Sequence, residues 1–485
     1  MPNKNALSSS LLMLSASWIS KGLGIISTVI LARILSPEDF GLVAIAMLIV
    51  YFFDIFSQTG TKQYLLSKDN ITTEDLDTAW TLNVITKSVI GLVIFFSADL
   101  MASFFNSDIK RTLFVCSIIP VIIGLESPAI NLVKREFNYQ GIFKLQLAAK
   151  FLGFITTITI ALETHSHWAM IFGTITYFLT LSIGSYFVTA YKPSFSLNNV
   201  ANQWNYSKWI LYRGFIGYAR AKGDAFLLAK FFSVAEVGIF SIAKELAMLV
   251  YEQVAMPIGE IIMTSIQKVK NDQKQIKTIM SKYIIILVAA LLPIICLFSL
   301  LSESIILFFL GDKWLDAAPI FSILTILGVT SSITIVFTST MNALKKTKQA
   351  FKVDLISTVI ILITLYLYNN STIIEFSFIR AMLGFVVLFA YIAASRKFIQ
   401  FKFTELSSSL LPIIISFVVM FIAVAWLKDI IIIESNFIYL CINSILGGAI
   451  YACTLSILIF ITPQKNCQLR VIAEPIKLKL KKIYK

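Results

Sequence analysis

The sequence predicts an all-α polytopic membrane protein with about 14 transmembrane helices. Of its 485 residues, 57% are hydrophobic and only 14% are charged, and the mean hydropathy is +0.82. Soluble domains carry about 25% charged residues, so this composition excludes a water-soluble enzyme. Apolar runs of about 20 residues, the length that a helix needs to cross a bilayer, recur along the whole chain.

Each apolar run is expected to be helical, because inside lipid every backbone amide must find its partner within the segment. The connections between runs are short, so no folded domain is expected outside the membrane. The predicted spans cover residues 9–31, 40–59, 79–98, 112–131, 145–162, 168–190, 208–229, 237–262, 283–301, 317–340, 353–369, 374–394, 408–427 and 437–461.

The basic residues predict the orientation of these spans. Of the 41 lysines and arginines, 27 fall on the side of the N-terminus, 6 on the opposite side and 8 inside spans. Because cytoplasmic loops are enriched in basic residues, both termini are expected in the cytoplasm. Topology thus accounts for 27 of the 41 basic residues behind the net charge of +14. The basic tail, 463–485, is interpreted as a topology and membrane-surface determinant rather than a nucleic-acid site.

Neither cysteines nor histidines indicate a metal site. The chain has five cysteines without a CxxC spacing, which supports neither a disulfide framework nor zinc binding. His165 and His167 have no third ligand nearby in the sequence and are interpreted as part of a solvated loop. We therefore expect no bound metal.

An internal repeat divides the chain. Residues 31–46 recur without a gap as residues 228–243, with six of sixteen positions identical, including Gly41 with Gly238. Six predicted spans separate the copies, so both cross the membrane in the same direction. This predicts two six-helix halves with a substrate cavity between them. The predicted parts are an N-terminal lobe (1–190), a C-terminal lobe (191–400), an extra helix pair (401–462) and the basic tail (463–485).

The hairpin Leu31-Ala-Arg-Ile-Leu-Ser-Pro-Glu-Asp-Phe-Gly41, with the fourteen-helix plan, resembles the Wzx-type polysaccharide flippases of the multidrug/oligosaccharidyl-lipid/polysaccharide exporter superfamily, in their O-antigen and colanic-acid branch. The resemblance implies two lobes in a V, without catalytic activity. It implies movement of undecaprenyl-diphosphate-linked repeat units from the cytoplasmic to the periplasmic leaflet of the bacterial inner membrane by alternating access. It also implies a polysaccharide polymerase and a chain-length regulator as partners.

Charged residues inside the spans are the candidates for a site. Each charge facing lipid costs about 2.5 to 3.5 kcal/mol, and the span 208–229 carries four besides Lys208 at its end. That helix must therefore line protein or water. At about 100° per residue, Arg213, Arg220 and Asp224 share one stripe, while Lys222 lies on the opposite face.

The first span carries a matching polar stripe that includes Lys21 and Gly24. We expect the cations to hold a diphosphate or acidic sugars, and the carboxylates to bind a coupling proton or sodium ion. The alternative is that these charges form structural ion pairs between helices. The substrate-binding candidates are Lys21, Arg213, Arg220 and Lys244, and the ion-coupling candidates are Asp54, Asp224, Glu245 and Glu252. Lys87 and Arg380, also within or near spans, are left outside this hypothesis.

Two other functions compete with the flippase. A multidrug or organic-cation antiporter of the same superfamily should have a net acidic cavity, whereas the two polar stripes here carry more positive than negative charge, with Lys21, Arg213 and Arg220 against Asp224. A membrane-embedded polymerase generally needs a sizeable loop outside the membrane, and the sequence has neither such a loop nor a P-loop or nucleophile motif.

Overall fold

The computed structural model describes residues 4–57, 60–68, 70–136, 139–399, 406–431, 433 and 435–461, with side chains except those of residues 4–18, 67, 201–213 and 408. This part of the chain contains helices and no strand, which confirms the all-α class. Contacts divide the chain into two compact units, Met1–Ser241 and Ile242–Lys485. The helix α11 (Val234–Val250) crosses this division.

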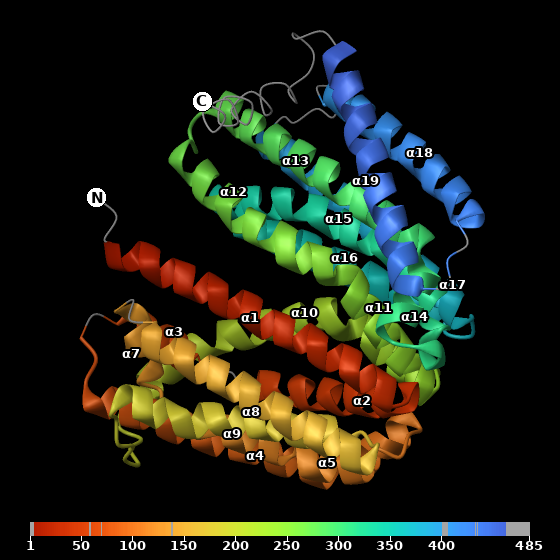
Figure 1. The fold of residues 1–485 in the computed structure, drawn as a ribbon. Coiled ribbons are helices and arrows are strands. Elements are labelled where there is room, and N and C mark those ends of the chain that lie inside the picture. Colours follow the sequence, from red (N-terminus) through yellow and green to blue (C-terminus); the bar gives the residue numbers. More distant parts are fainter. Residues whose placement is uncertain are drawn as a thin grey trace. The chain divides into compact units, whose positions relative to one another are not determined.

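Unit 1 is a bundle of long helices with several short ones between them. The helices α8 and α9 lie side by side, α1 packs on α8, and α4 packs on α5 and α6 (Figure 1). Its elements are α1 (Lys4–Ile34), α2 (Pro37–Asp54), η1 (Ile55–Ser57), α3 (Thr61–Ser67), α4 (Thr73–Phe105), α5 (Lys110–Cys116), α6 (Ile118–Gly124), α7 (Ile130–Arg135), α8 (Gln140–Thr164), α9 (Trp168–Thr189) and α10 (Val200–Phe231).

Unit 2 is built around α15, which contacts α12, α13, α14, α16 and α17. The hairpin of α18 and α19 packs on α13. After α11, the elements are the π-helical η2 (Tyr251–Ala255), α12 (Met256–Lys268), α13 (Gln273–Leu300), α14 (Ser302–Phe309), η3 (Asp312–Trp314), α15 (Ala317–Ala343), α16 (Thr347–Leu367), α17 (Ile373–Ile399), α18 (Ser407–Ile430) and α19 (Asn436–Ile461).

All fourteen predicted spans fall on helical segments. Within the described ranges, ten helices are long and apolar enough to cross a bilayer, so the multi-pass membrane class is confirmed. The total of fourteen stays a prediction, because the spans 9–31 and 208–229 are not among these ten and the other two missing spans are interrupted. The span 112–131 is divided among α5, α6 and the start of α7, and the span 237–262 contains η2. A proline at 128 disfavours helical geometry at the residue before it, and this accounts for the break after α6.

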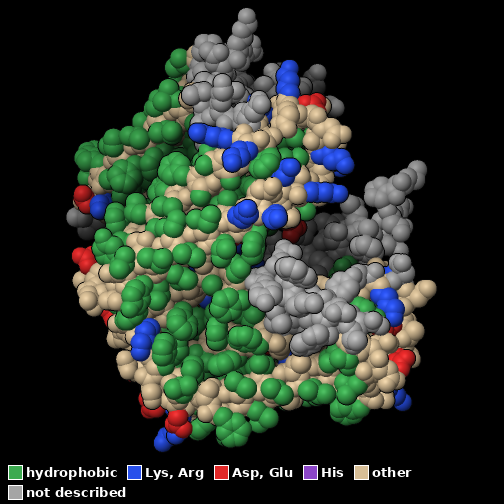
Figure 2. Space-filling view, turned by 180° about the vertical axis from the view of Figure 1, so that it is seen from behind, with side chains coloured by type: hydrophobic (Ala, Val, Ile, Leu, Met, Phe, Trp, Pro, Cys, Tyr) green, Lys and Arg blue, Asp and Glu red, His purple; other side chains and the backbone are tan. Residues whose placement is uncertain are grey.

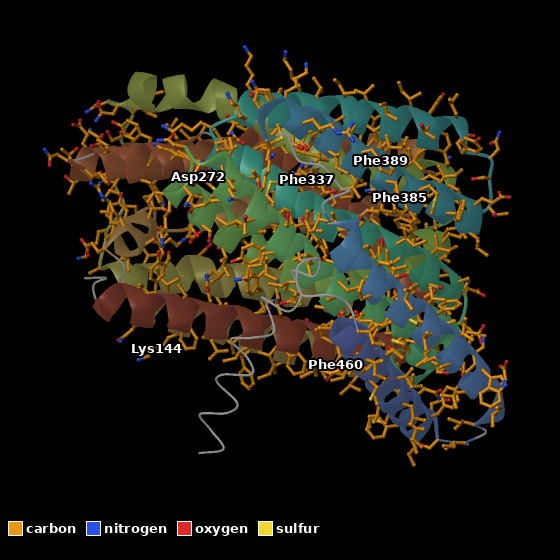
Figure 3. All side chains as sticks on the ribbon, turned by 90° about the horizontal axis from the view of Figure 1, so that it is seen from above. Lys144, Asp272, Phe337, Phe385, Phe389 and Phe460 are labelled. Atoms are coloured by element: carbon orange, nitrogen blue, oxygen red, sulfur yellow. The ribbon has the colours of Figure 1, made fainter. Side chains whose placement is uncertain are left out.

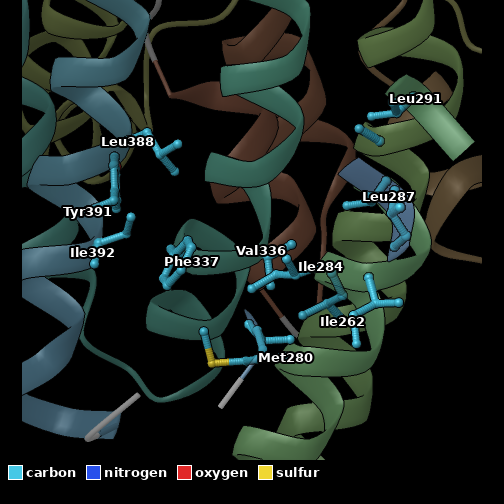
Figure 4. Packing of buried hydrophobic residues seen from close by; sticks show 14 of the residues in the cluster. Ile262, Met280, Ile284, Leu287, Leu291, Val336, Phe337, Leu388, Tyr391 and Ile392 are labelled. Carbon is cyan, nitrogen blue, oxygen red and sulfur yellow. The ribbon is translucent and has the colours of Figure 1, made fainter. Parts of the chain in front are cut away.

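The core of unit 2 is a continuous set of aliphatic and aromatic side chains. Figure 4 shows side chains of α13, α15 and α17 in this core, among them Ile284, Val336, Phe337 and Tyr391. Between membrane helices the hydrophobic drive is small, so the stability of this core depends on close van der Waals packing. The one polar atom of Tyr391 is satisfied, because its hydroxyl donates to Asp354 Oδ1 at 2.7 Å.

Large apolar side chains also lie on the outside of the helices. Phe389 is 62% exposed and Phe460 is 81% exposed, in contrast to the fully buried Phe337 (Figure 3). Hydrophobic side chains cover much of the face in Figure 2. Such a surface is unfavourable in water and is expected for helices that face lipid tails.

The two copies of the repeat adopt the same local structure. Ser36 Oγ accepts the backbone N–H of Asp39, whose carboxylate accepts the backbone N–H of Ser36. Ser233 and Glu236 make the same reciprocal pair at the start of α11. Each pair is a capping box that satisfies free N–H groups at a helix N-terminus. The matching serines and acidic residues of the repeat are therefore helix caps.

The repeat glycines lie where the starts of α2 and α11 approach each other. A Cβ atom built on Gly41 would lie 1.8 Å from the carbonyl oxygen of Val234, and one on Gly238 would lie 1.9 Å from that of Pro37. Pro37 and Val234 are equivalent positions of the repeat, so the contact is reciprocal, as across a twofold axis. The equivalence of the two copies is confirmed, while the predicted lobe boundaries stay a prediction.

Candidate functional site

Helix α10 combines a buried acid with exposed cations. Asp224 is 2% exposed, and its Oδ1 accepts the backbone N–H of Ala225 at 2.8 Å. Arg220 and Lys222 are exposed, and the side chain of Arg213 lies outside the described residues. A Cβ atom on Gly217, on the predicted stripe, would meet nothing within 4 Å. Part of this stripe is therefore not packed against a described neighbour.

The stripe on α1 has the same open character. Lys21 is half-buried, and a Cβ atom on Gly24 would also meet nothing within 4 Å among the described atoms. The part of this stripe that precedes residue 19 lies outside the residues whose side chains the structure describes. A long ammonium beside open space can reach a ligand, so Lys21 stays a candidate.

The candidates on the predicted span 237–262 lie in unit 2. Lys244 is half-buried on α11, Glu245 beside it is exposed, and Glu252 is exposed in η2. Pro257, near the start of α12, has no N–H to continue the helical hydrogen-bond ladder, which fits a single π-helical turn just before it. Such turns are frequent at functional sites.

Asp54 is the candidate with the clearest partner. Its Oδ1 lies 2.6 Å from Lys87 Nζ on α4, and Lys87 also donates to Ser57 Oγ at 3.1 Å. The side chains of Lys87 and Asp54 are 14% and 27% exposed. The pair is thus largely withdrawn from solvent and joins α2 to α4. Lys87 was outside the sequence hypothesis, although an acid and a base on neighbouring spans were a signal for such a pair.

The interpretation of His167 as part of a solvated loop is wrong. Its backbone N–H donates to Asp39 Oδ1 at 2.9 Å, and its Nε2 lies 3.0 Å from Thr112 Oγ1. The ring is largely buried because α5 and the capping box of α2 pack around it. His165 is exposed, as predicted. Within the described ranges, no group of three His, Cys, Asp or Glu residues could hold a metal ion.

These helices place cations and partly buried acids inside apolar segments. Among the candidate residues there is no nucleophile paired with a general base. Such an arrangement can bind and release charged groups. Residues 30–319, which include both copies of the repeat, match a family described as polysaccharide biosynthesis protein. The chain belongs to this family. The resemblance indicated by the first hairpin is thereby confirmed.

Two curated relatives of this polysaccharide biosynthesis protein are named for related pathways. The lipopolysaccharide biosynthesis protein WzxC of Escherichia coli (strain K12) is 22% identical over 352 residues, 71% of each chain. The succinoglycan biosynthesis transport protein ExoT of Rhizobium meliloti (strain 1021) is 21% identical over 310 residues, 63% of this chain and 62% of its own.

A solved structure shares the fold of this family member. The lipid II flippase MurJ, in an inward closed conformation, superposes with a TM-score of 0.75 at 16% sequence identity. The match covers 92% of this chain and 98% of MurJ. At this identity the likeness establishes the fold alone.

Proposed function

We propose that this protein is a flippase that moves lipid-linked oligosaccharide repeat units, carried on undecaprenyl diphosphate, from the cytoplasmic to the periplasmic leaflet by alternating access. The proposal rests on the family match across both repeat copies, together with cations on apolar helices of unit 1. A diphosphate needs converging positive charges, and a cation inside a membrane span is costly unless it has such a role or a partner.

The orientation proposed for the flippase follows the basic residues. With 27 of 41 on one side, both termini lie in the cytoplasm. The resemblance to the polysaccharide flippases implies that the membrane is the inner one. A polysaccharide polymerase and a chain-length regulator are the proposed partners, because they act on the repeat units after these reach the periplasm.

Lys21, Arg213, Arg220 and Lys244 are the residues proposed to hold the diphosphate or acidic sugars. A proton or a sodium ion is proposed to drive transport. Asp54 can take part only if its pair with Lys87 opens, since this ammonium already occupies one carboxylate oxygen. The other coupling candidates are Asp224, Glu245 and Glu252.

Complementation of a strain that lacks the gene tests the proposal. Arg213→Ala and Arg220→Ala should each lower the amount of surface polysaccharide at equal protein level. Lys222→Ala is the matched control, because it removes a cation from the opposite face of the same helix. Unchanged surface polysaccharide in the Arg213 and Arg220 variants, alone and combined, would refute their role.

The position of stalled repeat units separates a flippase from a polymerase. Without the flippase, lipid-linked single units should accumulate on the cytoplasmic leaflet, whereas loss of a polymerase would still allow single units to reach the surface. An antiporter for organic cations would instead change drug resistance. The excess of cations among the candidates of unit 1 argues against that function.

A further inference from the structure

A second group of charges lies in unit 1, away from the stripes of α1 and α10. Glu126 is half-buried in the turn between α6 and α7. The positive charges of Lys62 on α3, Lys87 on α4 and Lys134 on α7 all act on its carboxylate. In the part of the chain that the structure describes, this carboxylate makes neither a hydrogen bond nor an ion pair. Three ammonium groups from separate helices therefore act on an acid that none of them directly contacts.

The turn that carries Glu126 is held firmly by α9. The hydroxyl of Tyr186 donates to the carbonyl oxygen of Leu125 at 2.5 Å, and the backbone N–H of Ser127 donates to Ser185 Oγ at 2.8 Å. Trp80 Nε1 of α4 donates in turn to the hydroxyl of Tyr186 at 2.8 Å. These bonds flank Glu126 on both sides, so its backbone is fixed by neighbouring helices. Charges on such rigid elements are well suited to bind a ligand.

Lys87 is positioned by close packing of α4 against α6. A Cβ atom on Gly124 would lie 3.0 Å both from Lys87 Cβ and from the carbonyl oxygen of Asn83. The two helices therefore approach closely just before the Glu126 turn. The ammonium of Lys87 binds Asp54, so this lysine links the acid on α2 to the charges around Glu126.

Lys62 and Lys134 come from two short helices that pack on each other. Thr61 Oγ1 donates to Asn83 Oδ1 at 3.3 Å, which fastens the start of α3 to α4. Arg135 Nη1 donates to the carbonyl oxygen of Lys68 at 2.5 Å, which joins α7 to the end of α3. Burial lowers the pKa of Lys134, and the charge of Lys62 lowers it further, while Glu126 opposes the shift. The charges of Lys62 and Lys134 thus repel each other, and Glu126 offsets this repulsion.

The charge balance favours an anionic ligand. Three ammonium groups face two carboxylates, and one of these, Asp54, is already paired with Lys87. The backbone that carries Glu126 is fixed by neighbouring helices, so its carboxylate stays near these lysines. Lysine commonly binds phosphate, and its ammonium then acts as a point charge.

We propose that Lys62, Lys87 and Lys134 form a binding site for a phosphate-bearing anion, with the carboxylate of Glu126 as an internal competitor. The source of the phosphate rests on the proposed function: the loops of Lys62 and Lys134 are predicted on the cytoplasmic side, where a lipid-linked diphosphate would first meet the protein. The headgroup of an anionic phospholipid is the other source with the same chemistry.

Binding of inorganic pyrophosphate to the full-length protein tests this site. The protein is placed in nanodiscs of phosphatidylcholine, and affinity is measured by calorimetry. Lys62→Gln and Lys134→Gln should each weaken binding by about tenfold, the effect of losing one charge-assisted contact. Glu126→Gln should strengthen binding several-fold, because it removes the competing charge.

Lys144→Gln is the matched control, since Lys144 is an exposed lysine on α8 (Figure 3) and should leave the affinity unchanged. Lys134→Arg keeps the charge and should retain binding, which separates a lost ligand contact from a lost fold. Wild-type affinity in both glutamine variants of the lysines would overturn the proposal. Weaker binding in Glu126→Gln would overturn the role of Glu126 as a competitor.

Two further arms distinguish the sources of phosphate. Displacement of pyrophosphate by farnesyl diphosphate, a short prenyl diphosphate, supports the lipid-linked substrate. Weaker pyrophosphate binding in nanodiscs that contain phosphatidylglycerol supports a phospholipid headgroup. Both arms measure binding and not transport. Lysine-dependent binding by a protein that fails complementation would therefore refute the proposed function while leaving this site intact.

Discussion

The crossing of α2 and α11 allows a sharp test of the packing. Gly41→Ala would place a methyl group 1.8 Å from the backbone oxygen of Val234, and Gly238→Ala would place one 1.9 Å from that of Pro37. An ordinary contact needs about 3.5 Å. The two backbones would therefore have to separate by about 1.6 to 1.7 Å, and neither clashing atom is a side-chain end that can turn away.

The expected cost lies at the upper end of the range for overpacking. Inserting a methyl group into a packed site typically costs about 1 to 3 kcal/mol. Because the obstacle is backbone on both sides, each single variant should lose about 3 kcal/mol of stability. The double variant should lose less than the sum, since one separation of the two helices relieves both clashes.

Thermal unfolding of the purified protein in detergent measures this effect. Both single variants should melt at a clearly lower temperature than the wild type. Gly448→Ala is the matched control, because its new Cβ atom would meet nothing within 4 Å on α19. There, alanine in place of glycine should be neutral or stabilise by up to about 1 kcal/mol. Wild-type melting temperatures for the variants at positions 41 and 238 would show that the two backbones are not in close contact.

Three further outcomes follow from the ion pair, the lysine site and the helix caps. Asp54→Asn and Lys87→Met should each destabilise the protein by about 1 to 3 kcal/mol, because each leaves one charge partly buried without its partner. The double variant should recover most of that loss. A double-mutant cycle on melting temperatures checks this, and additive losses would contradict it. Because burial lowers the pKa of Lys134, this lysine loses its proton at a lower pH than an ordinary lysine, so pyrophosphate affinity should begin to fall at a lower pH than it would at a site of ordinary lysines. Calorimetry should find a smaller fall in Lys134→Arg, whose guanidinium stays charged, and equal pH profiles would argue against a lowered pKa. Ser36→Ala should lower the stability by about 1 kcal/mol, because α2 loses its N-terminal cap. Thermal unfolding measures this loss, and an equal loss in the conservative variant Ser36→Thr would contradict a capping role.

The sequence predicted the helical segments because their physical cause is local. A span needs about 20 apolar residues in one run, whatever surrounds it, and in the described residues the predicted runs are helical, with the longest exception in the stretch 125–129 between α6 and α7. The interruptions at η2 and after α6 were missed. They depend on how single prolines are accommodated by neighbouring helices, which hydropathy over a long window does not register.

The candidate site was only partly predictable. Asp54 stood out as an acid inside an apolar span, but its partner Lys87 lies 33 residues away on another helix. No periodicity within one helix reports such a pair. Glu126 was missed because it lies near one end of a predicted span, where a charge has little apparent cost. Its importance arises from three lysines on separate helices.

The sequence by itself determined that this is a membrane protein and that it contains a repeat. These properties follow from composition and from patterns within a few turns of helix. Only the tertiary structure decided that Gly41 and Gly238 meet reciprocal backbone carbonyls, that Lys87 pairs with Asp54, and which lysines surround Glu126. Those contacts join helices far apart in the chain, so they exist only once the helices have packed together.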